Sequence, residues 1–445
     1  MFSSPWHYFT DPVLQGPTIG SILMCFSSAL VGVIVFLRKR SLLGESLSHA
    51  TYPGVVLSVL LVSTFFPDAE EIIAIAILIG AFFTSILGLW LIEKLERRFK
   101  VKNDAAMCLI LAVFFGVGIL IASRLQSTHA LWYKTIQIFL YGQAATMTGI
   151  HVLLYLVLAC LMGASVLFLY RQIEIMTFDR NFARSVGMPL SLLDTLIFIL
   201  LVLAIVIGIR SVGVVLMAGM LIAPAVAARQ FTDRLWAVFL LASLFGALSG
   251  FLGNYLSVEL PAWGMRQGLG WKFSLPTGPM ILLSASSLCL GALLFAPSYG
   301  LLSRGFRILH FRTQCLAENL LKSLWKKGEG ARVSASLVKR SLSLSLFHAR
   351  ALLFYLSFQG WLEPAPEGGY RLTNDGVNRA LRIVRLHRLW EVYLVHLGQG
   401  VEKVHRSAEE MEHILTPELE HELTLLLQDP KHDPHQQPIP RGKEP

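Results

Sequence analysis

The residues best suited to bind a metal ion lie in a charged stretch close to the C-terminus. The helix expected there carries two histidines and two glutamates at positions i, i+4, i+7 and i+8: His405, Glu409, Glu412 and His413. These spacings place the four side chains within an arc of roughly 100°. Imidazole and carboxylate groups on one face are ligands for a borderline divalent cation such as Fe²⁺ or Mn²⁺. The alternative is a surface helix whose polar side chains are only solvated.

A second pair of chemistry-bearing residues, Glu45 and His49, lies one helical turn apart where a long apolar segment begins. Ionisable side chains in a membrane segment are costly unless they face a cavity or a partner. A carboxylate and an imidazole at this spacing can hold a divalent ion transiently, with water in its other coordination positions. The competing interpretation, weighted equally on the residues alone, is a Glu–His pair in the headgroup region. Pro53 and Gly54 follow and predict a break in the helix.

The elements that position these residues are mostly membrane helices. Of the 445 residues, 54% are hydrophobic and only 15% are charged, and the mean hydropathy of +0.59 is too high for a soluble globular protein. About nine segments are apolar enough and long enough to cross a bilayer. They lie near residues 16–37, 49–66, 72–92, 105–122, 149–170, 190–209, 212–228, 236–255 and 276–296. A further apolar segment, 132–148, is interrupted by Lys134, Gly142 and Gln143, which predicts a re-entrant or interfacial piece.

The distribution of basic residues predicts how these segments are oriented. Lys and Arg are absent from the first 37 residues and gather in loops at 38–40, 94–102, 171–184 and 229–234. Because cytoplasmic loops carry the excess of Lys and Arg, we expect these loops in the cytosol and the N-terminus outside. Nine spans then place the chain from residue 301 onward in the cytosol.

Between the fifth and sixth spans, residues 177–189 form a short amphipathic segment that ends in Gly-Met-Pro. A surface helix between spans is suited to docking on a cytosolic motor subunit, and the alternative is a plain loop helix. The chain contains no Gly-x-x-x-x-Gly-Lys-[Ser/Thr] phosphate loop. Any ATP that drives this protein must therefore be hydrolysed by another polypeptide, and the chain is not predicted to be an enzyme.

Three motifs of the membrane half resemble the permease subunit of the ABC-3 family of manganese, zinc and iron importers. They are the string Gly-Glu-Ser-Leu-Ser-His-Ala-x-x-Pro-Gly that contains Glu45 and His49, the segment 177–189, and the Gly- and Ala-rich segment 210–229. The string is the most specific of the three, although the family usually has Asp where Glu45 stands. The resemblance implies that Glu45 and His49 contact the metal in the translocation path.

The same resemblance, over roughly residues 10–300, implies the location and the partners. The location is a bacterial cytoplasmic (inner) membrane. The partners are a cytosolic ABC ATPase subunit, an extracytoplasmic metal-binding lipoprotein, and a second permease copy or paralogue. The residues expected to couple the permease to the ATPase are Phe178, Asp179, Phe182 and Arg184.

The charged C-terminal part follows the element order of a winged helix-turn-helix. Helical patterns at 317–327, 334–342 and 345–359 precede a Pro- and Gly-containing segment at 361–373 that is typical of a two-stranded wing. The third helix is expected to enter the major groove of DNA. Its candidate DNA contacts are Ser345, Phe347, His348, Arg350 and Ala351. Many small helical domains share this order, so the pattern alone does not establish DNA binding.

Residues 316–440 resemble the DtxR/MntR family of metal-dependent repressors. The resemblance rests on the stretch from Arg385 to Glu391, the helix that contains His405, and a closing Pro-His-x-x-Pro-Ile-Pro at 434–440. It implies a homodimer that binds operator DNA and a cofactor that is Fe²⁺ or Mn²⁺. The metal ligands that it implies are His387, Glu391, His405, Glu409, Glu412 and His413.

Two positions depart from the repressor family. Its first helix supplies an acidic or Met ligand, whereas the matching positions here are Asn319 and Lys322. A protonated lysine cannot bind a metal, so Glu318 or Cys315 would have to substitute. Glu409 stands where iron-type members often carry Cys, which resembles the manganese-type ligand set.

The expected fold is an all-α polytopic membrane domain of about nine transmembrane helices, followed by a cytosolic winged helix-turn-helix and a helical metal-binding and dimerisation domain. The expected boundaries are 1–300 for the permease, 301–315 for a linker, 316–380 for the DNA-binding domain and 381–445 for the metal-binding domain. This order resembles permease–repressor fusions of the chlamydial type, whose system is associated with iron.

The function expected from both resemblances is the permease subunit of an ABC importer for iron or manganese, with zinc as a further candidate, joined to a metal-dependent repressor. A rival is a membrane-tethered metal sensor that does not itself transport. A third possibility is a tail that only gates transport. Proteolysis within about residues 297–316 is also expected, because a freed tail could search the chromosome.

Overall fold

The structure of the chain is a computed structural model that describes residues 4–65, 70–128, 130–268, 274–328, 331–413 and 416–441. The chain divides into two compact units, Met1–Arg304 and Gly305–Pro445. The first is called the membrane unit below, and the second is called the tail.

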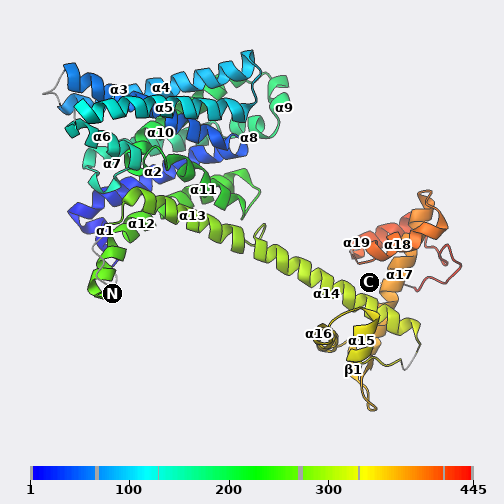
Figure 1. The fold of residues 1–445 in the computed structure, drawn as a ribbon. Helices are drawn as coiled ribbons and strands as arrows, with labels where there is room; N and C mark the ends of the chain where they lie inside the picture. The colour runs from blue at the N-terminus through cyan, green and yellow to red at the C-terminus, as the bar shows by residue number, and fades with distance from the viewer. Residues whose placement is uncertain are drawn as a thin grey trace. The chain divides into compact units, whose positions relative to one another are not determined.

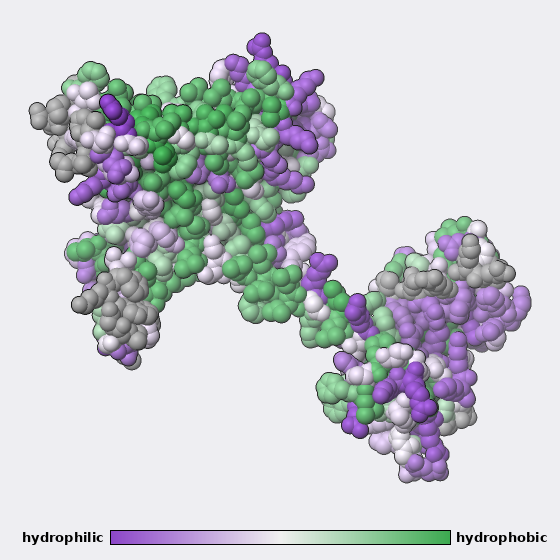
Figure 2. Space-filling model, in the orientation of Figure 1, coloured by the Kyte–Doolittle hydropathy of each residue, from purple (hydrophilic) through white to green (hydrophobic). Residues whose placement is uncertain are grey.

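The membrane unit is a bundle of apolar helices that lie side by side (Figure 1). Eight helices of the described residues are long and apolar enough to cross a bilayer. They are α2 (Pro12–Leu37), α3 (Ser41–Phe65), α4 (Glu70–Arg98), α5 (Asn103–Thr128), α7 (Gly149–Phe168), α10 (Leu190–Val212), α12 (Leu235–Arg266) and α13 (Thr277–Phe295). Hydrophobic side chains cover the middle of the bundle, and hydrophilic ones gather toward its ends (Figure 2). The polytopic all-α membrane domain is therefore confirmed.

The apolar segment expected at 212–228 does not form a membrane-length helix. Gly213, with a φ of 97°, ends α10, and the next helix, α11 (Met217–Arg229), has only 13 residues. At a rise of 1.5 Å per residue α11 is about 20 Å long, which is shorter than a hydrocarbon core of about 30 Å. The apolar composition continues across Gly213 although the helix does not, so composition alone overestimated the span.

Small residues bring α11 close to its neighbours. A Cβ atom on Gly32 of α2 would lie 1.8 Å from the backbone oxygen of Leu221, so the backbones of α2 and α11 are in direct contact there. Ala225, Ala227 and Ala228 of α11 are fully buried. Contacts through small side chains are the usual way in which membrane helices approach closely.

The break predicted at Pro53 and Gly54 is wrong, because α3 continues through both residues. A Cβ atom on Gly54 would lie 2.2 Å from the backbone oxygen of Gly80 in α4, so the packed backbone of α4 supports α3 at this point. The interrupted apolar segment at 132–148 forms α6 (Ala130–Tyr141) and the short 3₁₀ helix η1 (Ala144–Thr146). With 12 residues, α6 is too short to cross a bilayer.

Three of the basic loops are joined by ion pairs at one end of the membrane unit. Asp194 of α10 accepts from Arg38 at 2.8 Å and also contacts Arg180, while Arg40 pairs with Glu96 at 3.3 Å. The short helices α8 (Tyr170–Phe178) and α9 (Arg180–Ser185) belong to this end, whereas α1 (His7–Thr10) lies near the N-terminus (Figure 1).

The chain leaves the membrane unit beside the fourth basic loop. The Ser298 hydroxyl donates to the backbone oxygen of Phe231 at 2.9 Å, and the Tyr299 hydroxyl donates to Asp233 at 2.5 Å. Figure 1 shows the start of α14 at the same end of the membrane unit as α8 and α9. The basic loops and the exit of the chain therefore share one end of the bundle.

The tail contains six helices and one two-stranded sheet among its described residues. They are α14 (Leu301–Lys326), α15 (Ala335–Ser341), α16 (Leu346–Phe358), β1 (Leu362–Pro364), β2 (Tyr370–Leu372), α17 (Asn374–His396), α18 (Val401–Met411) and α19 (Pro417–Leu426). Helices α15 and α16 are bent by 112° from one another, as in a helix-turn-helix. The strands pair antiparallel with Leu362 opposite Leu372. The predicted winged helix-turn-helix is therefore confirmed as a fold.

The hydrophobic core of the winged helix-turn-helix lies between α14, α15 and α16, and includes Leu321, Val338 and Leu353. Helix α14 is longer than the sequence predicted. It begins at Leu301 rather than near residue 317, so the residues expected to form a linker at 301–315 are helical. Their apolar and basic side chains alternate at helical spacing, which favours an amphipathic helix even without a core.

Candidate metal centre

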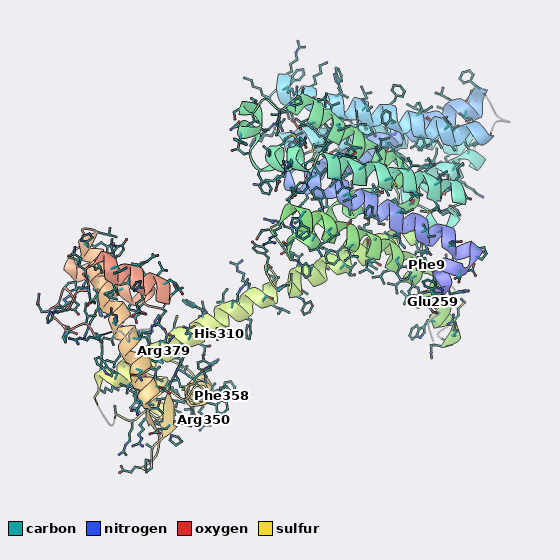
Figure 3. All side chains as sticks on the ribbon, turned by 180° about the vertical axis from the view of Figure 1, so that it is seen from behind. Phe9, Glu259, His310, Arg350, Phe358 and Arg379 are labelled. Atoms are coloured by element: carbon teal, nitrogen blue, oxygen red, sulfur yellow. The ribbon has the colours of Figure 1, made fainter. Side chains whose placement is uncertain are left out.

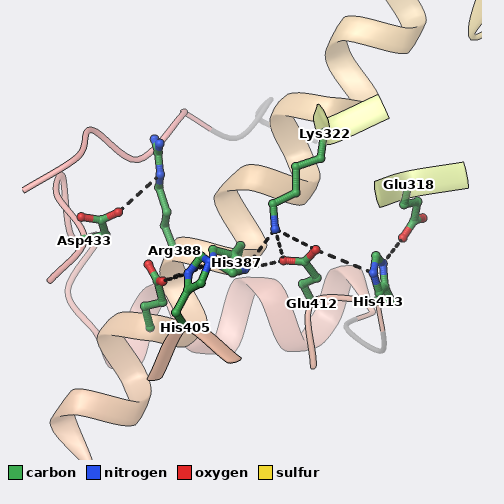
Figure 4. Close-up of polar contacts among 9 residues, drawn as sticks. Glu318, Lys322, His387, Arg388, His405, Glu412, His413 and Asp433 are labelled. Carbon is green, nitrogen blue, oxygen red and sulfur yellow. Dashed lines mark hydrogen bonds and ion pairs between the residues drawn. The ribbon is translucent and has the colours of Figure 1, made fainter. Parts of the chain in front are cut away.

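Three ligand-type side chains converge where α17 and α18 pack together (Figure 4). His387 and Glu391 lie one turn apart on α17, and His405 lies on α18. His387 Nε2 is 3.0 Å from His405 Nδ1 and 3.2 Å from Glu391 Oε1, and His405 Nδ1 is 2.8 Å from Glu391 Oε1. We call these three residues the triad.

The spacing of the triad atoms fits a divalent metal ion. Bonds of about 2.1 Å that meet near a right angle place two ligand atoms about 3 Å apart. The three distances in the triad, 2.8, 3.0 and 3.2 Å, have this length. Two imidazoles and one carboxylate are a ligand set that Fe²⁺, Mn²⁺ and Zn²⁺ all accept.

Local sequence explains why the triad forms. Thr373 caps α17 by accepting from the Gly376 amide at 3.1 Å, so the helix has a defined start and a fixed register. On α18, Val404 and Ala408 are fully buried at i and i+4, and this apolar pair packs the helix onto its neighbour. His405 follows Val404 directly and is thereby held at the edge of the contact.

The electrostatics of the triad favour a charged carboxylate. Burial alone would raise the pKa of the Glu391 carboxyl, but hydrogen bonds from His387 and His405 outweigh it and lower the pKa to about 2. Burial lowers the pKa of His387, but its hydrogen bonds to Glu391 and Glu412 outweigh this effect and raise the pKa above its usual value. Both pKa shifts favour a proton shared between the His387 imidazole and the Glu391 carboxylate.

Glu412 is not part of the triad but supports it from the other side of His387. It is almost fully buried, and its Oε2 lies 2.5 Å from His387 Nδ1. The Lys322 ammonium of α14 donates to both carboxylate oxygens of Glu412, at 2.9 and 2.8 Å, and lies 3.2 Å from His387 Nδ1. Metal-binding histidines usually donate their second ring nitrogen to such a carboxylate.

His413 belongs to a second cluster. Its Nδ1 lies 2.6 Å from Glu318 Oε2 of α14, and Glu318 also accepts from Arg379 at 2.5 Å and from Gln314 at 3.1 Å. These residues line a cavity of about 210 Å³ that also borders Glu412. We call Glu318, Glu412 and His413 the second cluster.

The four residues expected on one helix face do not share one helix. Helix α18 ends at Met411, so Glu412 and His413 lie beyond it and turn toward α14. Glu409 remains on α18 but is exposed, and it is not among the triad residues. Because α18 ends two residues before His413, the i+7 and i+8 spacing did not predict where Glu412 and His413 lie.

Of the first-helix positions that depart from the repressor family, Asn319 is half-buried and Lys322 contacts both Glu412 and His387. Burial is the largest effect on Cys315 and raises the pKa of its thiol, so it is not poised as a thiolate ligand. The sequence reasoning missed Arg379 and Gln314, which hold Glu318. Gln314 lies one helical turn before Glu318, so its spacing could have marked it, whereas the Arg379 contact joins two helices far apart in the chain.

The closing segment of the tail is fastened to α17 by two arginines. Arg388 donates to the Pro438 backbone oxygen and, at 2.6 Å, to the Gln437 side chain. Arg385 donates to the Pro440 backbone oxygen at 2.9 Å. The segment at 434–440 thus packs on the helix that carries His387 and Glu391.

All five candidate DNA contacts are exposed and lie at the N-terminal half of α16. Ser345 caps the helix, and its hydroxyl lies 2.7 Å from His348 Nδ1. Phe347 is 77% exposed. Arg350 is exposed on the same helix, which ends at Phe358, and Figure 3 labels both residues in the tail. The opposite face, including Leu352 and Leu356, is buried in the core.

In the membrane unit, Glu45 and His49 lie on α3 among buried residues. His49 is 8% exposed, Glu45 is half-buried, and the His49 ring stands edge-on to Phe115 at 4.6 Å between centroids. His49 Nδ1 is buried and has no hydrogen-bond partner among the described residues. A buried polar atom in this state is costly unless something else binds it.

The residues expected to couple the permease to an ATPase lie at the end of α8 and on α9, at the basic end of the membrane unit. Asp179 caps α9 by accepting from the amides of Asn181 and Phe182, at 3.0 and 2.9 Å. Phe178 is 65% exposed and Phe182 is 53% exposed. Arg184 is exposed on the same short helix. Two exposed phenylalanines on a capped surface helix suit a protein contact.

Two family matches identify the membrane unit as a transport permease and the end of the tail as a metal-dependent repressor domain. Residues 10–296 match the ABC 3 transport family, and residues 373–441 match the iron dependent repressor metal binding and dimerisation domain. The chain belongs to the ABC-3 transport family and carries this repressor domain at its C-terminus.

Similar proteins agree with both halves. The chain is 37% identical over 441 residues, 97% of each chain, to a "probable metal transport system membrane protein" of Chlamydia trachomatis. It is 31% identical to the manganese transport system membrane protein MntC of Bacillus subtilis, over 89% of this chain and 87% of that one. Among solved structures, PsaBC of Streptococcus pneumoniae has a TM-score of 0.55 and 25% identity, over 68% of this chain and 97% of the other.

Proposed function

We propose that the chain imports a divalent metal, iron or manganese, as the permease subunit of an ABC transporter, and that its tail is a cytosolic, metal-dependent DNA-binding repressor. The observation that carries the proposal is the triad, in which three ligand atoms from two helices lie 2.8 to 3.2 Å apart. The relatives that share the whole architecture support transport of a metal by the membrane unit.

In the tail, His387 Nε2, Glu391 Oε1 and His405 Nδ1 would hold the metal. The bound ion would supply a positive charge that ties α17 to α18 in place of the shared proton. Glu412 keeps His387 oriented from the opposite ring nitrogen, at 2.5 Å. The α14 helix would connect this site to DNA, because Lys322 and Glu318 contact His387 and Arg379 of α17. On the same helix, Leu321 packs in the core with α16.

In the membrane unit, Glu45 and His49 would contact the transported metal. Among the residues that the structure describes, none pairs with His49 Nδ1, so this atom is available for a ligand, and its position on a membrane helix supports a role in the path. The exposed phenylalanines Phe178 and Phe182 would dock on the ATPase subunit, with Asp179 and Arg184 shaping the contact. The remaining partners would be an extracytoplasmic metal-binding lipoprotein and a second permease copy or paralogue.

The orientation follows from the shared position of the basic loops and the exit of the chain. Because basic loops face the cytosol, the end that carries Arg38, Arg40 and Arg180 would be cytosolic, and so would the tail. The tail would bind operator DNA as a homodimer through the exposed face of α16.

The test of transport is radioactive manganese and iron uptake by cells that lack their own importer and express the chain with its ATPase and lipoprotein. Replacing both Glu45 and His49 with alanine should abolish uptake and leave metal binding by the tail intact. Unchanged uptake would instead favour a membrane-tethered sensor that does not transport. The matched control is Glu93→Ala, a partly exposed acidic residue of α4 that pairs with Arg97.

Release of the tail is a separate part of the proposal. The first half of α14 carries exposed apolar residues, including Leu302, Phe306 and Leu309, and has no core of its own. A helix segment without packing opens locally and becomes accessible to proteases. A blot of cell fractions with an antibody to the tail should show a soluble fragment cut within about residues 297–316. Detection of only full-length, membrane-bound protein in every growth condition would contradict release.

A further inference from the structure

Lys322 is a buried cation among residues that could otherwise bind a metal (Figure 4). Its side chain is 7% exposed, and its ammonium donates to both oxygens of Glu412 at 2.9 and 2.8 Å. Lysine is almost never buried in this way unless it is paired. The pair therefore fixes where one positive charge of the tail lies when no metal is bound.

The second cluster is electrically balanced by residues of the chain itself. Glu412 is paired with Lys322, and Glu318 is paired with Arg379 at 2.5 Å and accepts from Gln314. Two carboxylates therefore face two cations. A divalent ion that entered this cluster would add two positive charges within a few ångströms of a buried ammonium, where like charges repel strongly.

No such pairing with a lysine or arginine involves the Glu391 carboxylate of the triad among the contacts described above. Its three donor atoms contact one another, and the Lys322 ammonium reaches His387 only through Nδ1, the nitrogen that faces Glu412. Glu412 therefore occupies Nδ1 and leaves Nε2 directed at His405 and Glu391. The triad atoms are thus left to a cation, whereas the two carboxylates of the second cluster are already paired with Lys322 and Arg379.

We infer that the Lys322 ammonium acts as a built-in cation that takes the place of a metal in the second cluster, so that the tail binds a single metal ion, at the triad. Glu412 then orients His387 rather than binding metal, and His413 orients Glu318. The inference rests on the proposed metal-binding function of the tail. It assigns the two clusters different roles: one exchanges metal, and the other holds a permanent charge.

The test is the number of Mn²⁺ ions bound by the purified full chain, measured by equilibrium dialysis and elemental analysis. Glu45→Ala and His49→Ala are included throughout to remove ions bound in the membrane unit. The chain that carries only these two substitutions is called the parent and should bind a single ion. With His405→Ala added, it should bind none. Lys322→Glu, which replaces the ammonium with a carboxylate, should bind a second ion, and Lys322→Glu with His405→Ala should retain only that ion.

Two further variants separate the effect of the charge at position 322 from an effect of misfolding. Lys322→Arg keeps the positive charge and should still bind a single ion. Lys322→Met removes the charge without adding a ligand and should gain the second ion with weaker affinity, together with a larger rise in melting temperature on adding Mn²⁺. Two ions in the parent, or a single ion in both Lys322→Glu and Lys322→Met, would overturn the inference. Absence of metal from the parent would instead overturn the proposed function of the tail.

Discussion

Replacement of Glu391 by glutamine removes the only carboxylate of the triad and keeps the size of the side chain. The pKa of the Glu391 carboxyl is about 2 instead of 4.5, and at about 1.4 kcal/mol per pKa unit this difference corresponds to about 3 kcal/mol. Because the folded-state pKa is lowered, this stability is present at pH 7 and is lost as the pH falls from about 4.5 to about 2. The metal-free variant should therefore lose at most about 3 kcal/mol at pH 7, since glutamine still accepts a hydrogen bond.

The effect on metal binding should be larger. Carboxylates that only orient a metal ligand contribute roughly 10–100-fold to affinity. Glu391 would contact the ion itself, so Glu391→Gln should weaken Mn²⁺ binding by at least about 100-fold, which corresponds to about 2.7 kcal/mol. The measurement is competition with a fluorescent chelator on the purified full chain that carries Glu45→Ala and His49→Ala.

The matched control is Glu409→Gln, which removes an exposed carboxylate from α18 without touching the triad. Its Mn²⁺ affinity should equal that of the parent, because an exposed charge contributes little through solvent. Equal losses in both glutamine variants would refute the assignment of the triad. So would an unchanged affinity in Glu391→Gln with an intact fold by circular dichroism.

Three other predictions concern pH, packing and DNA. The pKa of His387 is raised, and this residue must lose a proton to bind metal, so Mn²⁺ affinity should fall as the pH drops below that pKa. The same proton stabilises the metal-free tail at low pH. Thermal melts should show that this contribution disappears as the pH rises through the pKa. Gly32→Ala should abolish folded permease on size-exclusion chromatography, because its Cβ would lie 1.8 Å from an α11 oxygen, whereas Gly163→Ala, with open space around it, should be tolerated. His348→Ala should weaken binding to operator DNA more than binding to random DNA. Arg350→Ala should weaken binding to both and reduce by about 1 the slope of log affinity against log salt concentration. Equal effects of the two variants in anisotropy titrations would contradict this division.

Most of the membrane fold could be predicted because its signal is compositional. A bilayer requires long apolar helices, and eight such helices of the described ranges lie where the hydropathy places them. The errors occurred where composition carries no information. The positive φ of Gly213 ends a helix inside an apolar run, and the backbone of α4 supports α3 across Pro53.

The arrangement of the candidate metal centre could be predicted only in part. His387 and Glu391 share an uninterrupted helix, so their i, i+4 spacing was a reliable guide. For Glu412 and His413 the spacing was misleading, because α18 ends at Met411 and the chain turns toward α14. The sequence marked Lys322 as unusual, but its pairing with Glu412 joins residues 90 positions apart and depends on tertiary packing.

The dependence of DNA binding on the triad can be measured in living cells even when the operator sequence is not known. Chromatin immunoprecipitation with an antibody to the tail should recover specific DNA sites from cells grown with manganese or iron. It should recover none after metal depletion, and none from cells that carry His405→Ala. Recovery of the same sites without metal, or from the His405→Ala cells, would show that the tail does not act as a metal-dependent repressor through this centre.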